Sequence, residues 1–196
     1  TYTQLNLNSA NDVTFCTASP PELIGARQVA SNYNHGLAIL CDNTVVGWGD
    51  NTYYQLGNTA PHLVAGWRSS NAVPVIFPST APRILSVATT SFSSAAVDEN
   101  GQVWIWGANL GAGYIPPPYT GNPTPQLLTN SQGAAVSTAI QVAGGDQRIF
   151  VLLRDGTVLA YGSDFLGDGT SNYYNYAVNV KTAGGSNLTN IKYIAG

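Results

Sequence analysis

The sequence predicts an all-β protein built from repeated four-stranded antiparallel units. Three observations predict this fold class: an apolar pattern that recurs along the 196 residues, a tight-turn signal at one place in each copy, and strands rich in Val, Ile, Trp and Tyr. No segment sustains the apolar spacing of a helix. Four short strands in each unit of roughly 50 residues are typical of a β-propeller blade. We expect about three blades, with partial blades at both ends.

The repeat is visible as three aligned copies, over residues 26–51, 84–109 and 140–164, and as the start of another at residue 191. One apolar position recurs in every copy: Val29, Val87, Val142 and Ile194. The interval is roughly 55 residues, and a fixed period of about this size indicates a repeat architecture.

Each copy opens with a short apolar strand, expected at Gln28–Ala30, Ser86–Ala88 and Gln141–Ala143. A second apolar strand follows, expected at Leu37–Leu40, Ala95–Val97 and Ile149–Leu153. A tight turn comes next, at Asp42-Asn43, Asn100-Gly101 and Asp155-Gly156. Asn-Gly and Asp-Gly pairs supply the positive φ that two-residue hairpins need.

The third strand of each copy ends in an aromatic residue followed by glycine: Trp48-Gly49, Trp106-Gly107 and Tyr161-Gly162. Loops rich in Pro, Gly and Asn then lead to a weaker fourth strand, expected for example at Ala72–Phe77 and Ala177–Val180. The blades are therefore expected at residues 24–82, 83–138 and 139–190, with the start of a fourth at 191–196.

The two ends of the chain do not match whole copies. Residues 1–23 are expected to form an N-terminal strand or partial blade, because Gln4-Leu5-Asn6-Leu7 alternates in polarity. A closed propeller has about four to eight blades, so we expect a piece of a larger protein or ends completed by a neighbouring chain. If residues 191–196 are ordered, they need a strand to pair with, either around Leu5–Leu7 or in another copy, which would give self-association through terminal strands.

The composition limits the classes of partner. Charged residues make up 9% of the chain and the net charge is −3, so neutral polar residues carry the polarity. Nucleic-acid binding is not expected, because it needs a basic stripe and only seven Lys and Arg are present. No apolar run is long enough to span a bilayer. Low charge predicts a secreted or cell-surface protein, and the absence of Met predicts a processed or excised chain.

The two cysteines, Cys16 and Cys41, are the candidates for one disulfide bond. The alternative is a pair of buried free thiols, since free cysteine is commonly buried. Two Cys and two scattered His do not make a metal-ligand spacing, so no metal site is expected. No cofactor is expected either.

Several motifs carry a family resemblance. The first copy contains His35-Gly36-Leu37-Ala38-Ile39-Leu40, then Gly47-Trp48-Gly49-Asp50-Asn51 and Tyr54-Gln55-Leu56-Gly57. The third contains Asp155-Gly156-Thr157-Val158 and Leu166-Gly167-Asp168-Gly169-Thr170. Over residues 24–196 this pattern resembles the repeats of the regulator-of-chromosome-condensation family. The resemblance implies propeller blades, and it says little about function because propellers host many unrelated activities.

The second copy departs from the family pattern. It has Phe92-Ser93-Ser94 where the His-Ser pair would stand, and Leu110-Gly111-Ala112-Gly113 in the following loop. The family's nuclear founder is a nucleotide-exchange factor, but no residue of that activity can be matched here. The degenerate loops and low charge resemble bacterial surface proteins that carry such repeats. A secreted β-lactamase inhibitor of the family implies that propeller rims bind proteins.

No motif predicts catalysis, so the chain is not expected to be an enzyme. Nucleophile elbows, zinc-protease helices and phosphate loops are missing from the sequence. His35 is expected to brace blade turns. The carboxylates Asp164 and Asp168 superficially resemble a calcium loop, but their spacing is wrong for one. Asn187-Leu188-Thr189 matches a glycosylation sequon, which in a bacterial protein is expected by chance.

Tyrosine is the pattern that points to a site. Seven of the eleven tyrosines lie in or beside the loops that follow the aromatic–Gly pairs: Tyr53, Tyr54, Tyr114, Tyr119, Tyr173, Tyr174 and Tyr176. Blade symmetry places these loops on one rim, and tyrosine is enriched at binding surfaces. The alternative is that they pack the loops onto neighbouring blades. The sequence thus predicts an extracellular or cell-surface interaction or adhesion module that binds a protein or glycan, with a structural subunit of an extracellular filament or appendage as the alternative.

Overall fold

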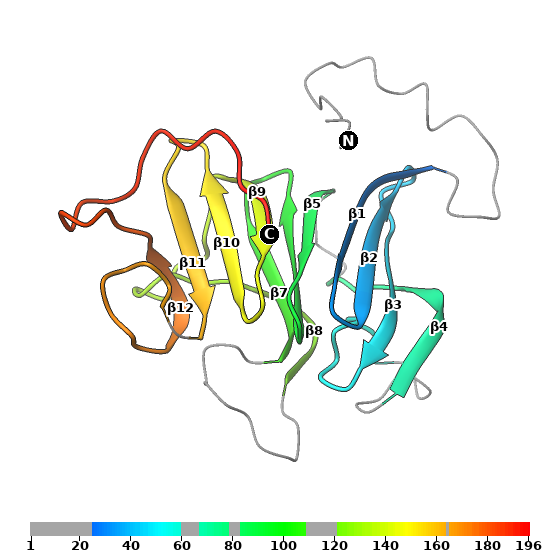
Figure 1. The fold of residues 1–196 in the computed structure, drawn as a ribbon. Coiled ribbons are helices and arrows are strands. Elements are labelled where there is room, and N and C mark those ends of the chain that lie inside the picture. Colours follow the sequence, from blue (N-terminus) through cyan, green and yellow to red (C-terminus); the bar gives the residue numbers. More distant parts are fainter. Residues whose placement is uncertain (1–24, 60–66, 79–82, 109–120, 164) are drawn as a thin grey trace, which may run out of the picture.

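A computed structural model describes residues 25–59, 67–78, 83–108, 121–163 and 165–196 of the chain. These residues form three four-stranded antiparallel sheets and no helix, which confirms the predicted all-β class. Within the same ranges, no helix is long and apolar enough to cross a membrane. Figure 1 shows the three sheets side by side, in the order of their blades along the chain.

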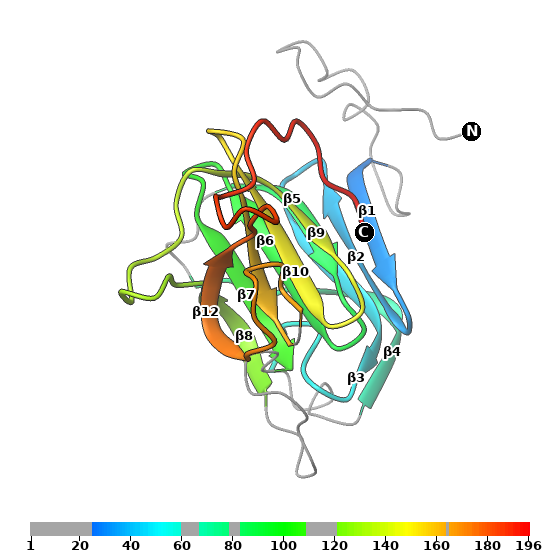
Figure 2. The same ribbon diagram turned by 60° about the vertical axis from the view of Figure 1, so that its left-hand side comes forward.

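Every sheet is a simple meander whose strands pair in chain order. The first sheet contains β1 (Ala26–Asn32), β2 (His35–Leu40), β3 (Val45–Asn51) and β4 (Trp67–Pro74). The second contains β5 (Ile84–Thr89), β6 (Ser93–Asp98), β7 (Val103–Ala108) and β8 (Gly121–Leu127). The third contains β9 (Ala139–Gly144), β10 (Arg148–Leu153), β11 (Val158–Gly162) and β12 (Tyr174–Asn179). The innermost strand β5 packs against β1 and β2 on one side and β9 on the other, as Figures 1 and 2 show.

The hydrophobic core lies between the sheets. One cluster joins the first two sheets and includes Leu37, Ile39, Val87 and Trp106. The other joins the second and third sheets and includes residues such as Val97 and Ile149. The second sheet contributes residues to both clusters, so both of its faces are apolar, and no sheet can bury an apolar face alone. Stacking blades against one another buries it, which is the reason for the repeated apolar positions.

The predicted turn and the aromatic–Gly pair have clear geometric reasons. Asn43, at the predicted turn of the first copy, has φ of 70°. Gly49, near the end of β3, has φ of 97°, and a Cβ atom there would collide with the backbone carbonyl of Asn34. Glycine is the residue that accepts both the left-handed conformation and the close approach. This explains the glycine at or near the end of each third strand, although β3 and β7 run past it, to Asn51 and Ala108.

The prediction of a fourth strand at Ala72–Phe77 was wrong in its bounds. The strand β4 ends at Pro74, and the apolar run beyond it crosses to the next blade. Val75 is buried in the cluster between the first two sheets, and the Phe77 ring packs edge-on against Trp104 and Trp106, with centroids 6.0 and 5.6 Å away. The run is apolar because it fills the gap between blades. The third-sheet equivalent was also displaced, since β12 covers Tyr174–Asn179.

A side chain on each inner strand bonds the backbone of the next repeat. Gln28 accepts from the Val87 N–H and donates to the Val87 carbonyl, both at 3.0 Å. Gln141 does the same with Ile194, at 3.2 and 2.8 Å. Residues 191–196 therefore lie against β9 in the place of the next inner strand, although they form no regular strand. The suggested pairing strand around Leu5–Leu7 lies outside the described residues.

Candidate functional site

One edge of the sheets carries the loops in which the tyrosines were found. It consists of the turns between the first two strands of each sheet and the loops after the third strands, and we call it the loop rim. Its described residues are 33–34, 52–58, 90–92, 145–147 and 165–173. The first-to-second strand turns lie at the lower edge of Figure 1. The turns at the other end of the strands form the opposite rim.

Exposed aromatic side chains gather at the loop rim. Among the described residues, five large aromatic side chains are strongly exposed: Tyr33, Trp67, Phe165, Tyr173 and Tyr193. Tyr33, Phe165 and Tyr173 lie on the loop rim itself. Trp67 lies beside it, as the first residue of β4, where it pairs with the last residue of β3. The exposed aliphatic side chains lie elsewhere, on the face of β1 or towards the opposite rim. The two rims therefore differ in the kind of apolar surface that they present.

Two of these aromatic residues also have a strained backbone. Tyr33 is 76% exposed with φ of 51°, and Phe165 is 72% exposed with φ of 46°. The left-handed conformation costs roughly 1–2 kcal/mol for a residue with a bulky side chain. Packing does not compensate for it at Phe165, because most of the ring is in water. Strain of this kind tends to collect at functional sites.

The rings nearest the junction of the first two blades form a small cluster. Phe92, at the tip between β5 and β6, packs against Tyr53 with centroids 5.1 Å apart. Tyr33 approaches the same ring edge-on at 6.4 Å. Edge-to-face and tilted pairs at these distances are favourable arrangements. The cluster anchors one side of the exposed Tyr33 ring and leaves the other side open to solvent.

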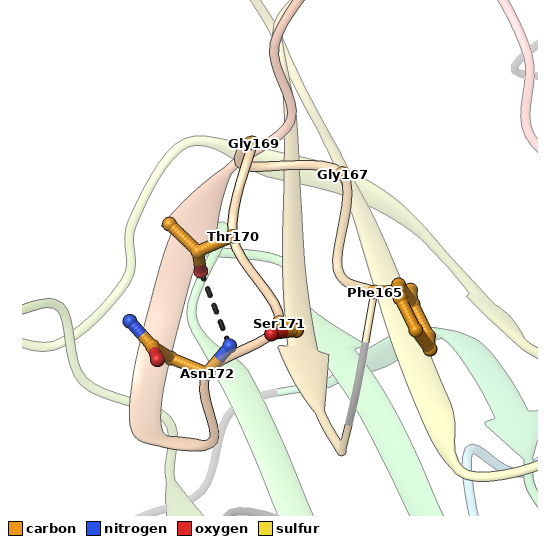
Figure 3. A pocket seen from close by; sticks show the side chains of 6 residues that line it. All are labelled: Phe165, Gly167, Gly169, Thr170, Ser171 and Asn172. Atoms are coloured by element: carbon orange, nitrogen blue, oxygen red, sulfur yellow. Dashed lines mark hydrogen bonds between the residues drawn. The ribbon is translucent and has the colours of Figure 1, made fainter.

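The loop after β11 forms a shallow hollow. Phe165 stands on one side, and Thr170, Ser171 and Asn172 supply polar groups on the other, as Figure 3 shows. Asp168 holds the loop in shape, since the backbone N–H and the hydroxyl of Thr170 both donate to its carboxylate at 3.0 Å.

The same loop also sets the ionisation of Asp168 and the position of Tyr174. Burial acts to raise the pKa of Asp168, but hydrogen bonds from Thr170 and Tyr174 outweigh it, so the pKa lies below its ordinary value. Asp168 is therefore ionised at neutral pH. The Tyr174 hydroxyl lies 3.1 Å from the Thr170 hydroxyl, which fixes the tyrosine on the loop.

The tyrosines predicted from the sequence separate into different environments. Tyr173 is 49% exposed on the loop rim. Tyr53, Tyr54, Tyr174 and Tyr176 are only partly exposed. Tyr53 packs on Phe92 of the next blade, and the rings of Tyr174 and Tyr176 pack together at 5.1 Å. Tyr114 and Tyr119 lie outside the described residues.

Sequence reasoning missed the exposed rings of Tyr33, Trp67 and Phe165. Only Tyr33 had a readable signal: it occupies the first position of a two-residue hairpin loop, Tyr33-Asn34, where Asn or Gly is usual. A bulky residue at that position is held at the tip, away from the core. Trp67 and Phe165 lie at or between the third and fourth strands of their sheets, where no sequence pattern indicates exposure.

His35 braces two blades, as expected. The ring is buried, and its Nε2 lies 2.9 Å from the hydroxyl of Ser94 in the second sheet. That hydroxyl donates to the Gln55 carbonyl at 2.9 Å, and the Trp106 indole N–H donates to the same oxygen at 2.7 Å. His35 must therefore donate from Nε2. Burial lowers the pKa of His35 to about 4, against the opposing charge of Asp50.

The remaining sequence candidates are the two cysteines and the residue types that bind metals. Cys41 is disulfide-bonded. Its predicted partner, Cys16, lies outside the described residues, so the pairing stays a prediction. Within the part of the chain that the structure describes, no group of three His, Cys, Asp or Glu could hold a metal ion.

Three four-stranded meanders, stacked through their inner strands and repeating the same turn, define a repeat protein of the β-propeller class. Residues 26–55 match the family model described as the Regulator of chromosome condensation (RCC1) repeat. The predicted resemblance to the RCC1-type repeat β-propeller family is thus confirmed, and the family model matches the first copy of the repeat.

Similar proteins support the same family. Protein pim1 of Schizosaccharomyces pombe is 29% identical over 148 residues, which cover 70% of this chain and 25% of pim1. The structure of Prp20p from Saccharomyces cerevisiae matches with a TM-score of 0.67 at 20% identity, over 82% of this chain and 39% of Prp20p. Human WBSCR16 matches with a TM-score of 0.63 at 17% identity, over 81% of this chain and 40% of WBSCR16. The chain thus spans a quarter of pim1 and about two fifths of the two solved proteins.

Proposed function

We propose that the chain is a non-catalytic module that binds a protein partner against its loop rim. The observation that carries the proposal is the pair Tyr33 and Phe165, two bulky rings that are exposed on one rim with positive φ. Aromatic side chains give large contact areas at low entropic cost, and binding hot spots are enriched in Tyr and Trp. A partner that covers these rings would recover the apolar burial that the free chain lacks.

Two observations on related proteins support protein binding in general. Prp20p is described as binding Gsp1p and histones, and it has also been seen with Kap60 bound to it. At 20% identity these likenesses support the scaffold and not those partners. We therefore extend to this chain the class of partner, a folded protein or protein segment, and leave its identity to experiment.

The non-catalytic part of the proposal rests on His35 and on the acidic groups of the rim. His35 is buried between two blades and its Nε2 proton is committed to Ser94, so it has no access to a substrate. Asp168 is bonded within its own loop. General acid–base catalysis needs a titratable group that reaches the reacting atoms, and neither of these groups does.

We further propose that the module works outside the cell. Support comes from the low fraction of charged residues, 9%, and from the disulfide bond of Cys41, since disulfides persist in oxidising compartments. The test is thiol labelling of the native protein before and after reduction. Labelling only after reduction is expected, and a native chain purified from its source with Cys41 already reactive would refute this location.

The binding proposal is tested with a photo-reactive amino acid placed at position 33, at position 165 or, as the control, at Tyr193, which is also an exposed aromatic. Crosslinking from the first two positions to one protein identifies a partner. The affinity of that purified partner is then measured for the wild type, for the double variant Tyr33→Ser with Phe165→Ser, and for Tyr193→Ser. We expect the double variant to bind about tenfold more weakly or worse, because aromatic anchors often contribute more than 1 kcal/mol each.

The control variant Tyr193→Ser should bind like the wild type. Circular dichroism and urea unfolding must show that the double variant stays folded, which its exposed side chains make the expected result. Equal affinities of the wild type and the folded double variant would overturn the proposal.

A further inference from the structure

Two arginine side chains from neighbouring blades converge on one neutral atom at the opposite rim. Arg27, in β1, donates from a terminal guanidinium nitrogen to the Asn43 side-chain oxygen at 3.0 Å. Arg83, just before β5, donates from Nε to the same oxygen at 2.8 Å. The two nitrogens are therefore at most about 6 Å apart, a distance at which neighbouring charges act on each other.

No carboxylate neutralises this pair within the described residues. The ion pair found there joins Arg68 to Asp50, on the other rim. Arg27 makes its remaining hydrogen bonds to the carbonyl oxygens of Leu40 and Ile84, which are uncharged. Burial, and then the positive charge of Arg83, lower the pKa of Arg27, as two unneutralised cations side by side require.

The nearest acidic groups are occupied elsewhere. The Asp42 carboxylate accepts from the Thr44 backbone N–H at 2.8 Å. Glu99 accepts from the backbone N–H of Arg83 at 3.4 Å, so it faces the main chain of that residue. These groups reduce the net positive charge of the area without bonding either guanidinium.

We propose that the Arg27–Arg83 pair binds a divalent phosphate group, either free or carried as a monoester on a partner. Each guanidinium has five N–H donors in a planar fork that matches phosphate oxygens. Among the described residues, the Arg83 side chain bonds only through its Nε–H, so its terminal nitrogens are available on the exposed side. A dianion neutralises both charges at once, whereas a single carboxylate neutralises one.

This site is separate from the proposed loop-rim function, because Asn43 and Arg83 lie at the other end of the strands. It joins the first and second blades through Arg27 and Arg83, and a bound phosphate would bridge them. Each proposal can therefore fail without the other.

The most informative variant is Asn43→Asp. It keeps the shape of the side chain and places a carboxylate oxygen where the amide oxygen now accepts from both arginines. Asp also tolerates the φ of 70° at this position. The variant is expected to melt at a higher temperature than the wild type and to lose the response to phosphate, because its own carboxylate fills the site.

The test measures inorganic phosphate binding by calorimetry and by thermal shift at constant low ionic strength, with acetate as the monovalent comparison. We expect phosphate to bind the wild type at least fivefold more tightly than acetate does, because surface ion pairing depends on charge and is screened by salt. Arg83→Gln should lose this preference. The matched control is Arg154→Gln, a change at another exposed arginine of the same rim, which should keep it.

Two outcomes overturn the proposal. One is an equal response of the wild type and the Asn43→Asp variant to phosphate, and the other is an equal affinity of the wild type for phosphate and acetate. A phosphoserine peptide, compared with its unphosphorylated form, separates the two sources of the ligand: a gain over free phosphate assigns the site to a phosphorylated partner, and equal affinity assigns it to free phosphate. If Arg83→Gln does not fold, the Asn43→Asp comparison still decides the matter.

Discussion

Lowering the pH from about 7 to about 5 is expected to weaken the fold through one side chain, His35. The ring is buried between two blades, and its Nε2 proton is donated to Ser94. Its other nitrogen, Nδ1, has no hydrogen-bond partner within the described residues. A proton added to the ring would create a buried charge, and burial outweighs the support that the charge of Asp50 and the backbone of Ser93 would give it. Burial accordingly lowers the pKa in the folded state to about 4, from 6.5.

The sign follows from the direction of this shift. Because the folded state holds the proton more weakly than the unfolded state, the full stability is present above pH 6.5 and is lost as the pH falls towards 4. Each pKa unit corresponds to about 1.4 kcal/mol, so the loss is about 1.4 kcal/mol near pH 5.5 and about 3 kcal/mol near pH 4. The pKa values of Asp42, Asp155 and Asp168 are also lowered, but these groups lose their contribution only below pH 3.8. The window between about pH 5 and pH 7 therefore reports on His35.

Urea unfolding followed by tryptophan fluorescence at several pH values in this window measures the effect. The matched control is His35→Gln, which keeps a side-chain N–H to donate to Ser94 and cannot titrate. This variant is expected to be less stable at neutral pH and to show a nearly flat profile between pH 5 and pH 7. A wild-type profile that is equally flat, or the same slope in both proteins, would refute the account of His35 as a buried neutral brace. The comparison also removes any contribution of His62, which is present in both proteins.

Two further predictions concern backbone geometry. Phe165→Asn is expected to raise the free energy of unfolding by about 1 kcal/mol, because asparagine adopts positive φ more readily and the Phe165 ring is mostly in solvent; a loss of that size in urea unfolding would show that the ring is packed. Gly144→Ala is expected to cost about 3 kcal/mol or more, because its Cβ would collide with a backbone carbonyl of the second sheet. Gly145→Ala, whose Cβ has its nearest neighbour at 3.8 Å, is the matched control, and equal melting temperatures for the two variants would contradict the close contact between inner strands.

The repeated core was predictable from the sequence because it follows from local rules. The turn at Asn43 and the glycine at position 49, near the end of β3, each need a backbone conformation that few residues adopt, so the residue type reveals the conformation. Short apolar runs rich in Val, Ile, Trp and Tyr then identify the strands between these points. The structure accordingly confirms the all-β class and the four-stranded units.

The bounds of the fourth strands and the exposed aromatic side chains were less predictable. The run Val75–Phe77 would be apolar both as a strand and as a segment packed between blades. Its packing between blades is seen only in the structure, where the Phe77 ring contacts Trp106 of the next blade. Similarly, Tyr53 and Tyr173 occupy similar loops in the sequence, yet one packs on the neighbouring blade and the other is exposed. The sequence shows how many aromatic residues the rim loops contain, whereas the exposure of each side chain depends on contacts between repeats.

One position on the inner strand bonds the next repeat in every copy, but the residue at that position differs between copies. Gln28 and Gln141 each satisfy both the N–H and the carbonyl of one residue in the next inner strand. Ser86, at the same position of the second copy, is shorter and accepts one bond, from the Val142 N–H at 3.4 Å. Each of these hydrogen bonds contributes about 1 kcal/mol, so the junction of the second and third blades has one such bond where the other junctions have two. Its compensation lies at the loop rim, where the Ser91 hydroxyl and backbone N–H donate to the side chain and carbonyl of Asp146. The blades are therefore joined by different residues at different positions along their inner strands, while the apolar core between them repeats.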